Sequence, residues 1–345
     1  MNVNAHAPAL NAKDYASDQE VRWCPGCGDY AILKAVLRTL ADLRADPAKT
    51  VFVSGIGCAS RFPYYVSTYG FHGIHGRAPA IATGIKLANP DLDVWIISGD
   101  GDALSIGGNH LIHLLRRNVD VQILLFNNEI YGLTKGQYSP TSHRGTRSPS
   151  SPFGSLDPAL SPAALALGAR ARFVARAVDT QQAHLPGILA RARSHKGASF
   201  VEIFQNCIVY NDGVFADFTD KAVAAEAQIH VEHGKPLIFG RNRDKGLRLK
   251  PGGLELEVVE LGKDGVDESG ILVHDETNHT LATLLVAMDK PVALGVLYCD
   301  PAPSYERAVS DRIAAAQAEV ETRTEGQPPG INALLRAGTT WTVTG

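Results

Sequence analysis

The feature that most constrains the fold is an alternation of short, almost continuously apolar segments with segments of helical periodicity. The apolar segments have the length of strands and are Thr50–Gly55, Val94–Ser98, Val121–Phe126 and Ser199–Phe204. The segments with helical periodicity are Tyr30–Leu43, Ala78–Ala88, Ile106–Arg117 and His184–His195. Strands without a polar face are typical of parallel sheets that helices cover on both sides. The alternation therefore predicts an α/β fold with an open, mostly parallel sheet and helices on both faces.

The second part of the chain has a looser pattern. We expect residues 1–210 to form the main domain and residues 211–345 to form a C-terminal extension that packs on this domain or on a partner subunit. In the extension, KPLIFG, LELEVVEL and PVALGVLYCD favour strands, and TLATLLVAM and RAVSDRIAAAQAEV favour helices. The Ser-, Pro- and Gly-rich stretch Tyr138–Pro158 in the main domain predicts a long loop.

Composition and charge exclude several classes of protein. With 45% hydrophobic and 20% charged residues, the chain of 345 residues can bury a sizeable core. The formal net charge of -3 provides no basic excess for binding nucleic acid. The apolar runs are far shorter than the about 20 residues that cross a bilayer. The start of the chain, MNVNAHAPALNAK, lacks the basic and apolar regions of a secretory signal. We therefore expect a cytoplasmic protein with neither a nucleic-acid nor a membrane partner.

Polar turns follow two of the predicted strands. Asp100, in GDGDA, comes after VWIIS, and Asn127 and Asn128 come after VQILLF. Open α/β sheets bind ligands at the carboxyl ends of their strands. Glycines let a backbone approach a phosphate closely, whereas a carboxylate beside a phosphate requires a cation between the two. GDG alone also describes ordinary surface turns, but the two turns together predict a Mg²⁺ site beside a bound phosphate, with Asn128 as a further oxygen ligand.

Four of the five cysteines fall where the predicted topology brings chain segments together. Cys24 and Cys27 share the turn RWCPGCGDY, and Cys58 and Cys207 each follow a predicted strand. A reducing compartment and an odd number of cysteines disfavour disulfides. Four converging thiolates suit a 4Fe-4S cluster, and a zinc ion remains an alternative on cysteine chemistry alone. Cys299 ends another apolar run, and we expect it to be a small buried side chain.

Taken in order, these motifs resemble those of the beta subunits of 2-oxoacid:ferredoxin oxidoreductases. The resemblance extends from about Asp18 to Asp220 and includes WCPGCGDY, GIGC, YGFHGIHGRAPAIATGIKLANP, GDGD, the NN pair, YGLTKGQYSPTS and QNC. The chain contains GDG, then the 25 residues Asp102–Phe126, then NN. This arrangement is similar to the motif that binds thiamine diphosphate and magnesium. The resemblance implies the thiamine diphosphate-binding fold, and it looks closest to the 2-oxoglutarate branch of the family.

The resemblance also implies roles for particular residues. The Mg²⁺ ligands would be Asp100, Asn128 and Ile130. The 4Fe-4S ligands would be Cys24, Cys27, Cys58 and Cys207. Thiamine diphosphate would contact Ile56, Gly57, Cys58, Ala59, Gly99, Gly101, Asp102, Asn127, Gly132 and Leu133.

Two further residues are candidates for contact with the diphosphate or the substrate. His75 lies in the loop FHGIHGR, ahead of a predicted helix, and can donate to the diphosphate or the substrate; the alternative is a loop histidine without a role. Arg61, three residues after Cys58, is our candidate partner for a second substrate carboxylate, because a guanidinium can grip a carboxylate with two donors. The alternative is a surface arginine or one that pairs with a partner subunit.

The implied activity is the thiamine-dependent oxidative decarboxylation of 2-oxoglutarate to succinyl-CoA and CO₂, with coenzyme A as cosubstrate. Electrons would pass through the 4Fe-4S cluster to ferredoxin; the reverse reaction is the reductive carboxylation of the reductive TCA cycle. Decarboxylation of a 2-oxoacid needs an electron sink, which thiamine diphosphate provides.

The chain has no clear candidate for the glutamate that activates thiamine. The resemblance implies that an alpha subunit supplies this residue, that the chain is inactive alone, and that two alpha–beta heterodimers form a heterotetramer. Alternative functions are a pyruvate:ferredoxin oxidoreductase beta subunit, a thiamine-dependent decarboxylase without redox function, and an electron-transfer subunit with a vestigial thiamine site.

Overall fold

The structure is a computed structural model that describes residues 10–323 together with residues 335, 337–338, 341 and 343. An eight-stranded sheet forms the centre of this described part. In spatial order its strands are β2 (Tyr69–His72), β1 (Thr50–Ser54), β3 (Asp93–Gly99), β4 (Gln122–Asn127), β8 (Ser199–Phe204), β7 (Phe173–Val178), β13 (Val292–Cys299) and β9 (Gln228–Val231). All neighbouring strands are parallel except β7 and β13, which are antiparallel.

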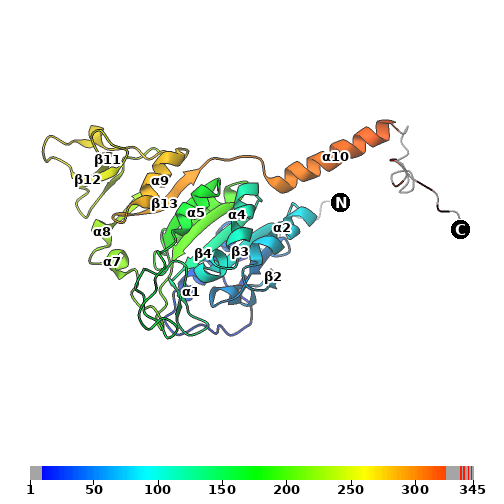
Figure 1. Ribbon diagram of the computed structural model, residues 1–345, viewed down its shortest axis with the longest axis horizontal. Coiled ribbons are helices and arrows are strands. Elements are labelled where there is room, and N and C mark those ends of the chain that lie inside the picture. Colours follow the sequence, from blue (N-terminus) through cyan, green and yellow to red (C-terminus); the bar gives the residue numbers. More distant parts are fainter. Residues whose placement is uncertain (1–9, 324–334, 336, 339–340, 342, 344–345) are drawn as a thin grey trace.

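Helices cover both faces of this main sheet (Figure 1). One face carries α2 (Ala78–Ala88), α4 (Gly108–Arg117), α5 (Pro162–Gly168) and α9 (His279–Ala287), and the other carries α1 (Asp29–Asp42) and α6 (Leu185–Ser194). In β3, Val94 and Ile96 belong to the hydrophobic core of the first face, and Trp95 and Ile97 belong to that of the second. Because both faces are buried, the strands read as continuous apolar runs. The predicted fold class is confirmed.

The predicted strands and helices of the main domain are present, with ends that differ by at most two residues. Three strands of the main sheet, β2, β7 and β9, were not predicted. In β7 the apolar run is interrupted by Arg176, which is nevertheless buried because its Nε donates to Glu202 Oε2 at 2.9 Å. Because a charged residue interrupts the apolar run, the sequence pattern did not predict this strand. Every residue of β2 is exposed. This strand therefore has no apolar run from which it could be predicted.

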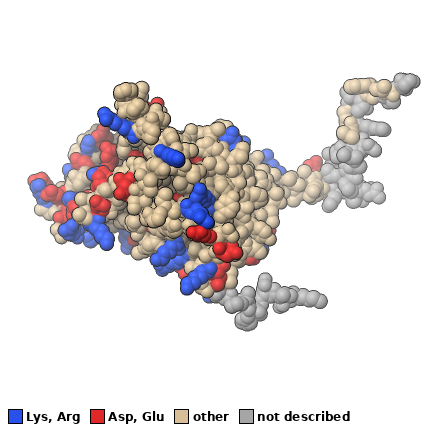
Figure 2. Space-filling view, turned by 90° about the horizontal axis from the view of Figure 1, so that it is seen from below, with Lys and Arg blue, Asp and Glu red and all other residues tan. Residues whose placement is uncertain are grey.

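Residues beyond 210 contribute to three different places. β9 and β13 complete the main sheet, so the boundary expected near residue 210 precedes two of its strands. A small antiparallel sheet contains β10 (Ile238–Phe239), β11 (Lys245–Leu249) and β12 (Leu256–Glu260). α10 (Tyr305–Arg323) runs away from the body at the opposite end of the molecule (Figure 1). Figure 2 shows acidic and basic side chains intermixed at the end that carries the small sheet, where ion pairs such as Arg248–Glu257 form.

Several short elements complete the described part. They are α3 (Asp100–Leu104), β5 (Ile130–Tyr131), β6 (Gln137–Tyr138), α7 (Ala216–Thr219), α8 (Ala224–Ala227) and the 3₁₀ turns η1 (Ala59–Tyr65) and η2 (Glu268–Gly270). Within the residues that the structure describes, no helix has both the length and the apolar character needed to cross a membrane.

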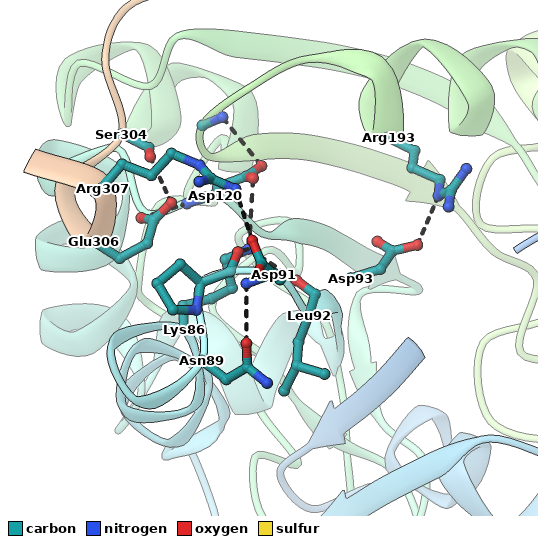
Figure 3. Close-up of polar contacts among 12 residues, drawn as sticks. Lys86, Asn89, Asp91, Leu92, Asp93, Asp120, Arg193, Ser304, Glu306 and Arg307 are labelled. Atoms are coloured by element: carbon teal, nitrogen blue, oxygen red, sulfur yellow. Dashed lines mark hydrogen bonds and ion pairs between the residues drawn. The ribbon is translucent and has the colours of Figure 1, made fainter. Parts of the chain in front are cut away.

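The base of α10 is fixed at the amino edge of the main sheet (Figure 3). The buried carboxylate of Glu306 accepts hydrogen bonds from the backbone N–H of Asp120 (3.2 Å) and from Ser304 Oγ (2.5 Å). Arg307 forms an ion pair with Asp91 at 3.3 Å. These contacts set the direction in which α10 leaves the body.

Candidate functional site

Two cavities adjoin at the carboxyl edge of the main sheet. The first, which we call the acidic cavity, has a volume of about 210 Å³ and is lined by the segments that follow β1, β3 and β4, with Asp100 and Asp102 in its wall. The second, the cysteine cavity, has a volume of about 200 Å³. Its wall contains Cys24, Cys27, Cys58 and Cys207. Four residues line both cavities: Cys58, Asn128, Gly132 and Leu133.

Asp100 forms the floor of the acidic cavity at the point where β3 gives way to α3. Its side chain is buried, and its Oδ2 accepts hydrogen bonds from Ser139 Oγ (2.5 Å) and Thr141 Oγ1 (2.6 Å). Burial raises the pKa of Asp100, and the two hydroxyl donors oppose that shift. Both hydroxyls come from the loop that the sequence predicted at Tyr138–Pro158. Ser139 and Thr141 were not predicted as site residues, and the only signal for them in the sequence is the polar run YSPTS.

Asn127 and Asn128 point in different directions. Asn127 accepts a hydrogen bond from Thr141 Oγ1 (3.0 Å) and donates to Glu202 Oε1 (2.8 Å), which in turn pairs with Arg176. Asn127 is therefore part of a buried network beneath the site, and it does not line the acidic cavity, although we predicted a cofactor contact. Asn128 does line that cavity. The network holds the end of β4 in place and so fixes where Asn128 lies.

The turn after β4 offers oxygen ligands beside Asp100. Asn128 Nδ2 donates to Gln205 Oε1 (2.7 Å), and Asn128 Oδ1 accepts from the N–H of Ile130 (3.2 Å), which leaves the amide oxygen a second lone pair. Glu129 between them has a positive φ of 56° and a buried side chain, and burial together with nearby Asp100 raises its pKa to about 8. A carboxylate, an amide oxygen and a backbone carbonyl at Ile130 are the hard ligands that Mg²⁺ prefers.

Glycines make room at the acidic cavity. A Cβ on Gly101 would lie 2.2 Å from a ring carbon of Tyr131, whose hydroxyl donates to the Gly101 carbonyl at 3.1 Å. Gly57 has φ of +126°, a conformation that other residues rarely adopt. Of the residues predicted to contact thiamine diphosphate, those that line this cavity are Ile56, Gly57, Cys58, Ala59, Gly99, Gly101, Asp102, Gly132 and Leu133.

The two histidines that precede α2 have different surroundings. His75 lines the acidic cavity, and its Nδ1 lies 2.6 Å from Asp102 Oδ1. His72 instead contacts the Tyr64 hydroxyl at 3.2 Å and lines neither cavity. His75 is thus the histidine that can meet a ligand here.

The first pair of cysteines occupies a tight turn. The N–H of Cys27 donates to the carbonyl of Cys24 at 3.0 Å, and Gly26 has φ of +85°. Proline at the second position and a glycine of positive φ at the third are typical of a type II turn. The sequence Cys-Pro-Gly-Cys therefore holds both thiols on one side of the cysteine cavity by local conformation alone.

The other two cysteines reach the cavity from strand ends. A Cβ placed on Gly132 would lie 3.5 Å from Cys207 Sγ and 3.7 Å from Cys58 Sγ, so both thiols border this glycine. Trp23 Nε1 donates to the carbonyl of Cys58 (2.7 Å), which ties the segment after β1 to the Cys-Pro-Gly-Cys turn. Four thiols from three distant parts of the sequence thus surround one cavity.

The surroundings of three of these thiols favour the neutral form. Burial raises the pKa of Cys27, Cys58 and Cys207, that of Cys58 to about 12, and the buried carboxyl of Asp29 adds to the shift. Burial also raises the pKa of Asp29 itself, to about 7. A metal centre supplies the positive charge that would deprotonate such thiols. Among the described residues, no group of three or more His, Cys, Asp or Glu side chains is arranged so that it could hold a metal ion.

Two other predicted positions lie away from the acidic cavity. Arg61 lines the cysteine cavity, and its guanidinium donates to the carbonyl of Arg22 at 2.8 Å. Its role toward a substrate carboxylate stays a prediction. Cys299 is buried on β13 with its Sγ 3.9 Å from His195 Nδ1, and it lines neither cavity.

Comparison with known proteins identifies the family. Residues 55–203 match the family described as "Thiamine pyrophosphate enzyme, C-terminal TPP binding domain". A protein of Mycobacterium tuberculosis named "2-oxoglutarate oxidoreductase subunit KorB" is 49% identical over 354 residues, an alignment that covers 99% of this chain and 92% of the relative. The chain belongs to the beta subunits of 2-oxoacid:ferredoxin oxidoreductases.

Further relatives of this beta subunit agree with that assignment. The "2-oxoacid:ferredoxin oxidoreductase 1, subunit beta" of Aeropyrum pernix is 51% identical over 196 residues, which cover 57% of this chain and 62% of the relative. The solved 2-oxoglutarate:ferredoxin oxidoreductase from Magnetococcus marinus, with 2-oxoglutarate, coenzyme A and succinyl-CoA bound, superposes with a TM-score of 0.73 and 32% identity over 96% of this chain and 97% of that chain. The resemblance inferred from the motifs is confirmed.

Membership in this family makes the chain a subunit of an oxidoreductase that acts on 2-oxoacids. The match to a thiamine pyrophosphate-binding domain extends from the end of β1 to β8, so it includes most of the wall of the acidic cavity. A beta subunit also implies an alpha subunit as its partner.

Proposed function

We propose that this beta subunit takes part in the oxidative decarboxylation of 2-oxoglutarate to succinyl-CoA and CO₂, with electrons passed through a 4Fe-4S cluster to ferredoxin, or in the reverse reductive carboxylation. The observation that carries the proposal is the wall that the two cavities share. Cys58, Asn128, Gly132 and Leu133 face both, so a thiamine cofactor on one side and a cluster on the other would be neighbours. A thiamine-dependent decarboxylase without redox function has no need of the second cavity.

The acidic cavity suits thiamine diphosphate and Mg²⁺. Asp100, Asn128 and the carbonyl of Ile130 would hold the metal ion, and Gly101 lets the backbone approach the diphosphate. Once bound, thiamine diphosphate supplies the electron sink that a 2-oxoacid needs in order to lose CO₂. The hydroxyls of Ser139 and Thr141 keep the Asp100 carboxylate in place before the cofactor arrives. This preorganisation lowers the cost of binding.

The cysteine cavity suits a 4Fe-4S cluster held by Cys24, Cys27, Cys58 and Cys207. Such a cluster supplies a one-electron acceptor. Gln205 connects the two cavities, because its Nε2 lies 3.4 Å from Cys27 Sγ while its Oε1 accepts a hydrogen bond from Asn128. The buried carboxyl of Asp29 lies beside Cys27.

An alpha subunit would complete the acidic cavity. The only carboxylates in its wall, among the described residues, are Asp100 and Asp102. The first is our Mg²⁺ ligand, and the second already accepts four hydrogen bonds. We expect the glutamate that activates thiamine to come from the partner, as the resemblance to this family implies. The side chains of Ile56 and Leu133 in the cavity wall are 38% and 42% exposed, which leaves apolar surface for that partner to cover. We expect a dimer of two such heterodimers.

We choose 2-oxoglutarate as the substrate, with pyruvate as the runner-up. The Mycobacterium tuberculosis relative is named for 2-oxoglutarate, and the Magnetococcus marinus structure holds 2-oxoglutarate, coenzyme A and succinyl-CoA. The distal carboxylate of 2-oxoglutarate needs a cationic partner in a partly desolvated site. Arg61 is the candidate in this chain.

The experiment is an assay of the assembled enzyme. The chain is produced with its alpha subunit, purified without oxygen, and tested for reduction of a low-potential viologen dye that stands in for ferredoxin. We expect dye reduction that requires 2-oxoglutarate, coenzyme A and thiamine diphosphate together, and no activity from the beta subunit alone. Faster reduction with pyruvate would reassign the substrate. Decarboxylation of either acid with no dye reduction would favour the non-redox alternative.

A further inference from the structure

The carboxylate of Asp102 joins three separate segments of the chain at the acidic cavity. Its Oδ1 accepts hydrogen bonds from His75 Nδ1 (2.6 Å), the N–H of Gly76 (2.7 Å) and the N–H of Ile56 (3.1 Å). Its Oδ2 accepts a hydrogen bond from Ser98 Oγ (2.5 Å). The side chain is only 2% exposed. Each carboxylate oxygen has two lone pairs, so the three donors fully occupy Oδ1, and Ser98 occupies one of the two lone pairs of Oδ2.

The surrounding backbone leaves space for this carboxylate and for little else. A Cβ on Gly55 would lie 2.1 Å from Asp102 Oδ2, and a Cβ on Gly107 would lie 2.4 Å from the Asp102 carbonyl oxygen. Gly76 has φ of +70°, and a Cβ there would lie 2.5 Å from the Gly107 nitrogen. Three glycines from three segments thus permit the close approach of the chain around Asp102.

Asp102 determines how His75 is presented. Because Nδ1 lies against a carboxylate oxygen, that nitrogen carries a proton, and the orientation of the ring is fixed. His75 Nε2 makes no hydrogen bond within the described part of the chain, and the ring lines the acidic cavity. Nε2 is therefore the atom available to a ligand in that cavity.

Asp102 also holds the segment that carries Cys58. The N–H of Ile56, two residues before Cys58, donates to Asp102, while Trp23 holds the Cys58 carbonyl from the side of the cysteine cavity. One buried carboxylate is thereby linked to both the histidine of the acidic cavity and the wall between the two cavities.

We propose that Asp102 is a positioning residue. It orients His75 so that Nε2 meets the diphosphate, it fixes the segment Ile56–Cys58, and its own carboxylate does not contact the diphosphate. An ionised carboxylate has no proton to donate, so an anion placed against it would meet repulsion without a compensating hydrogen bond. The inference rests on the proposed function, because it takes the acidic cavity to be the site of thiamine diphosphate.

A double-mutant cycle on the dissociation constant of thiamine diphosphate tests this proposal. The measurement is calorimetric titration of the assembled alpha–beta complex with Mg²⁺ present, for wild type, His75→Ala, Asp102→Asn and the double variant. Asp102→Asn keeps an oxygen for the two backbone donors, and the Ser98 hydroxyl can turn to accept from the new amide. We expect His75→Ala to weaken binding about tenfold and Asp102→Asn about threefold, since a charge-assisted bond becomes a neutral one.

The double variant separates the two roles. If Asp102 acts through His75, the double variant binds no more weakly than His75→Ala, because the second change removes nothing further. Losses that multiply to about thirtyfold would show that Asp102 contributes to binding by a route other than His75 and would overturn the inference that it acts on the diphosphate through this histidine. A wild-type complex that does not bind thiamine diphosphate would overturn the proposed function instead.

One further measurement uses the same variants. The electron paramagnetic resonance signal of the reduced complex should shift in Asp102→Asn and stay unchanged in His75→Ala, because only Asp102→Asn alters a residue that contacts the segment before Cys58. An unshifted signal in Asp102→Asn would remove that part of the proposal.

Should Asp102→Asn fail to fold, His75→Asn replaces it. Its amide keeps a donor near the Nδ1 position but places nothing at Nε2, so it should bind as weakly as His75→Ala. Wild-type affinity in His75→Asn would contradict the proposal. Asp91→Asn, at the opposite edge of the sheet, is the matched control.

Discussion

The two edges of the main sheet both contain cavities, but their polar groups are arranged in opposite ways. At the amino edge, beneath α10, lies a cavity of about 360 Å³, larger than either cavity at the carboxyl edge. Three ion pairs join six of its charged side chains, as Figure 3 shows for Arg193 with Asp93 and for Arg307 with Asp91. At the carboxyl edge, the four cysteines, Asn128 and His75 line the cavities, and Nε2 of His75 makes no hydrogen bond within the described part of the chain.

Lys86 illustrates the amino edge most clearly. Its buried ammonium donates to the carbonyls of Pro90 and Leu92, both at 2.8 Å, and lies 3.5 Å from Asp120 Oδ2. All three protons of this ammonium have acceptors, so nothing remains for a ligand. Cavity size alone therefore does not distinguish a binding site from a structural junction here.

The largest effect predicted from this comparison is the loss of the cluster. Cys207→Ala removes one of four thiolate ligands, so the anaerobic complex should lose its broad visible absorption and its bound iron. Cys299→Ala alters a cysteine that lines neither cavity, so the complex should keep both. Iron analysis and the visible spectrum check the pair. An equal loss of iron in the two variants would mean that the cysteine cavity is not the metal site.

At the amino edge we predict a large change in stability without a change in binding. Lys86→Met leaves the buried carboxylate of Asp120 without its cation, which should lower the free energy of unfolding by about 3 kcal/mol. Chemical denaturation of the beta subunit measures this. The affinity of the folded complex for thiamine diphosphate should match that of wild type. A specific loss of cofactor affinity in Lys86→Met would show that the two edges are coupled.

Asp100→Ala provides the corresponding test at the carboxyl edge. It removes the only carboxylate that we assign to Mg²⁺, so the affinity for thiamine diphosphate should fall about a hundredfold, in the range seen when metal sites are weakened. The iron content should stay unchanged, because Asp100 does not line the cysteine cavity. Titration in the presence of Mg²⁺ checks this, with Asp91→Ala as the control. Undiminished affinity would make the GDG and NN turns ordinary structural turns.

The smallest predicted effect concerns substrate choice. Arg61→Ala should raise KM for 2-oxoglutarate about tenfold and leave KM for pyruvate almost unchanged, because only 2-oxoglutarate has a second carboxylate. Steady-state assays on both acids give the comparison. An equal increase for both acids would assign Arg61 to the structure of the cysteine cavity, where its guanidinium holds the carbonyl of Arg22.

Sequence reasoning succeeded where the type of a residue and its position after a strand were enough to place it at the carboxyl edge of the sheet. Asp100 and Asn128 follow strands that are neighbours in the sheet, and Cys58 and Cys207 follow strands whose carboxyl ends reach the same edge. The parallel topology places such residues together whatever the details of packing.

Sequence reasoning did not succeed where a residue's place in the site depends on the direction of its side chain or on the fold of a distant loop. Asn127 and Asn128 are adjacent, and only the buried network with Glu202 shows which one turns away from the cavity. The contacts of Ser139 and Thr141 with Asp100 bridge about forty residues and depend on how a loop folds back. The four donors to Asp102 come from three segments whose approach depends on glycines, and no local pattern contains that information.

The central claim is that the two cavities at the carboxyl edge hold cofactors that exchange electrons across their shared wall. The most direct test is electron paramagnetic resonance of the anaerobic alpha–beta complex, frozen after addition of 2-oxoglutarate and coenzyme A without ferredoxin. The account predicts the signal of a reduced 4Fe-4S cluster, dependent on thiamine diphosphate and absent in Cys207→Ala. A complex that contains zinc without iron, or a cluster that dithionite reduces but no 2-oxoacid does, would contradict it.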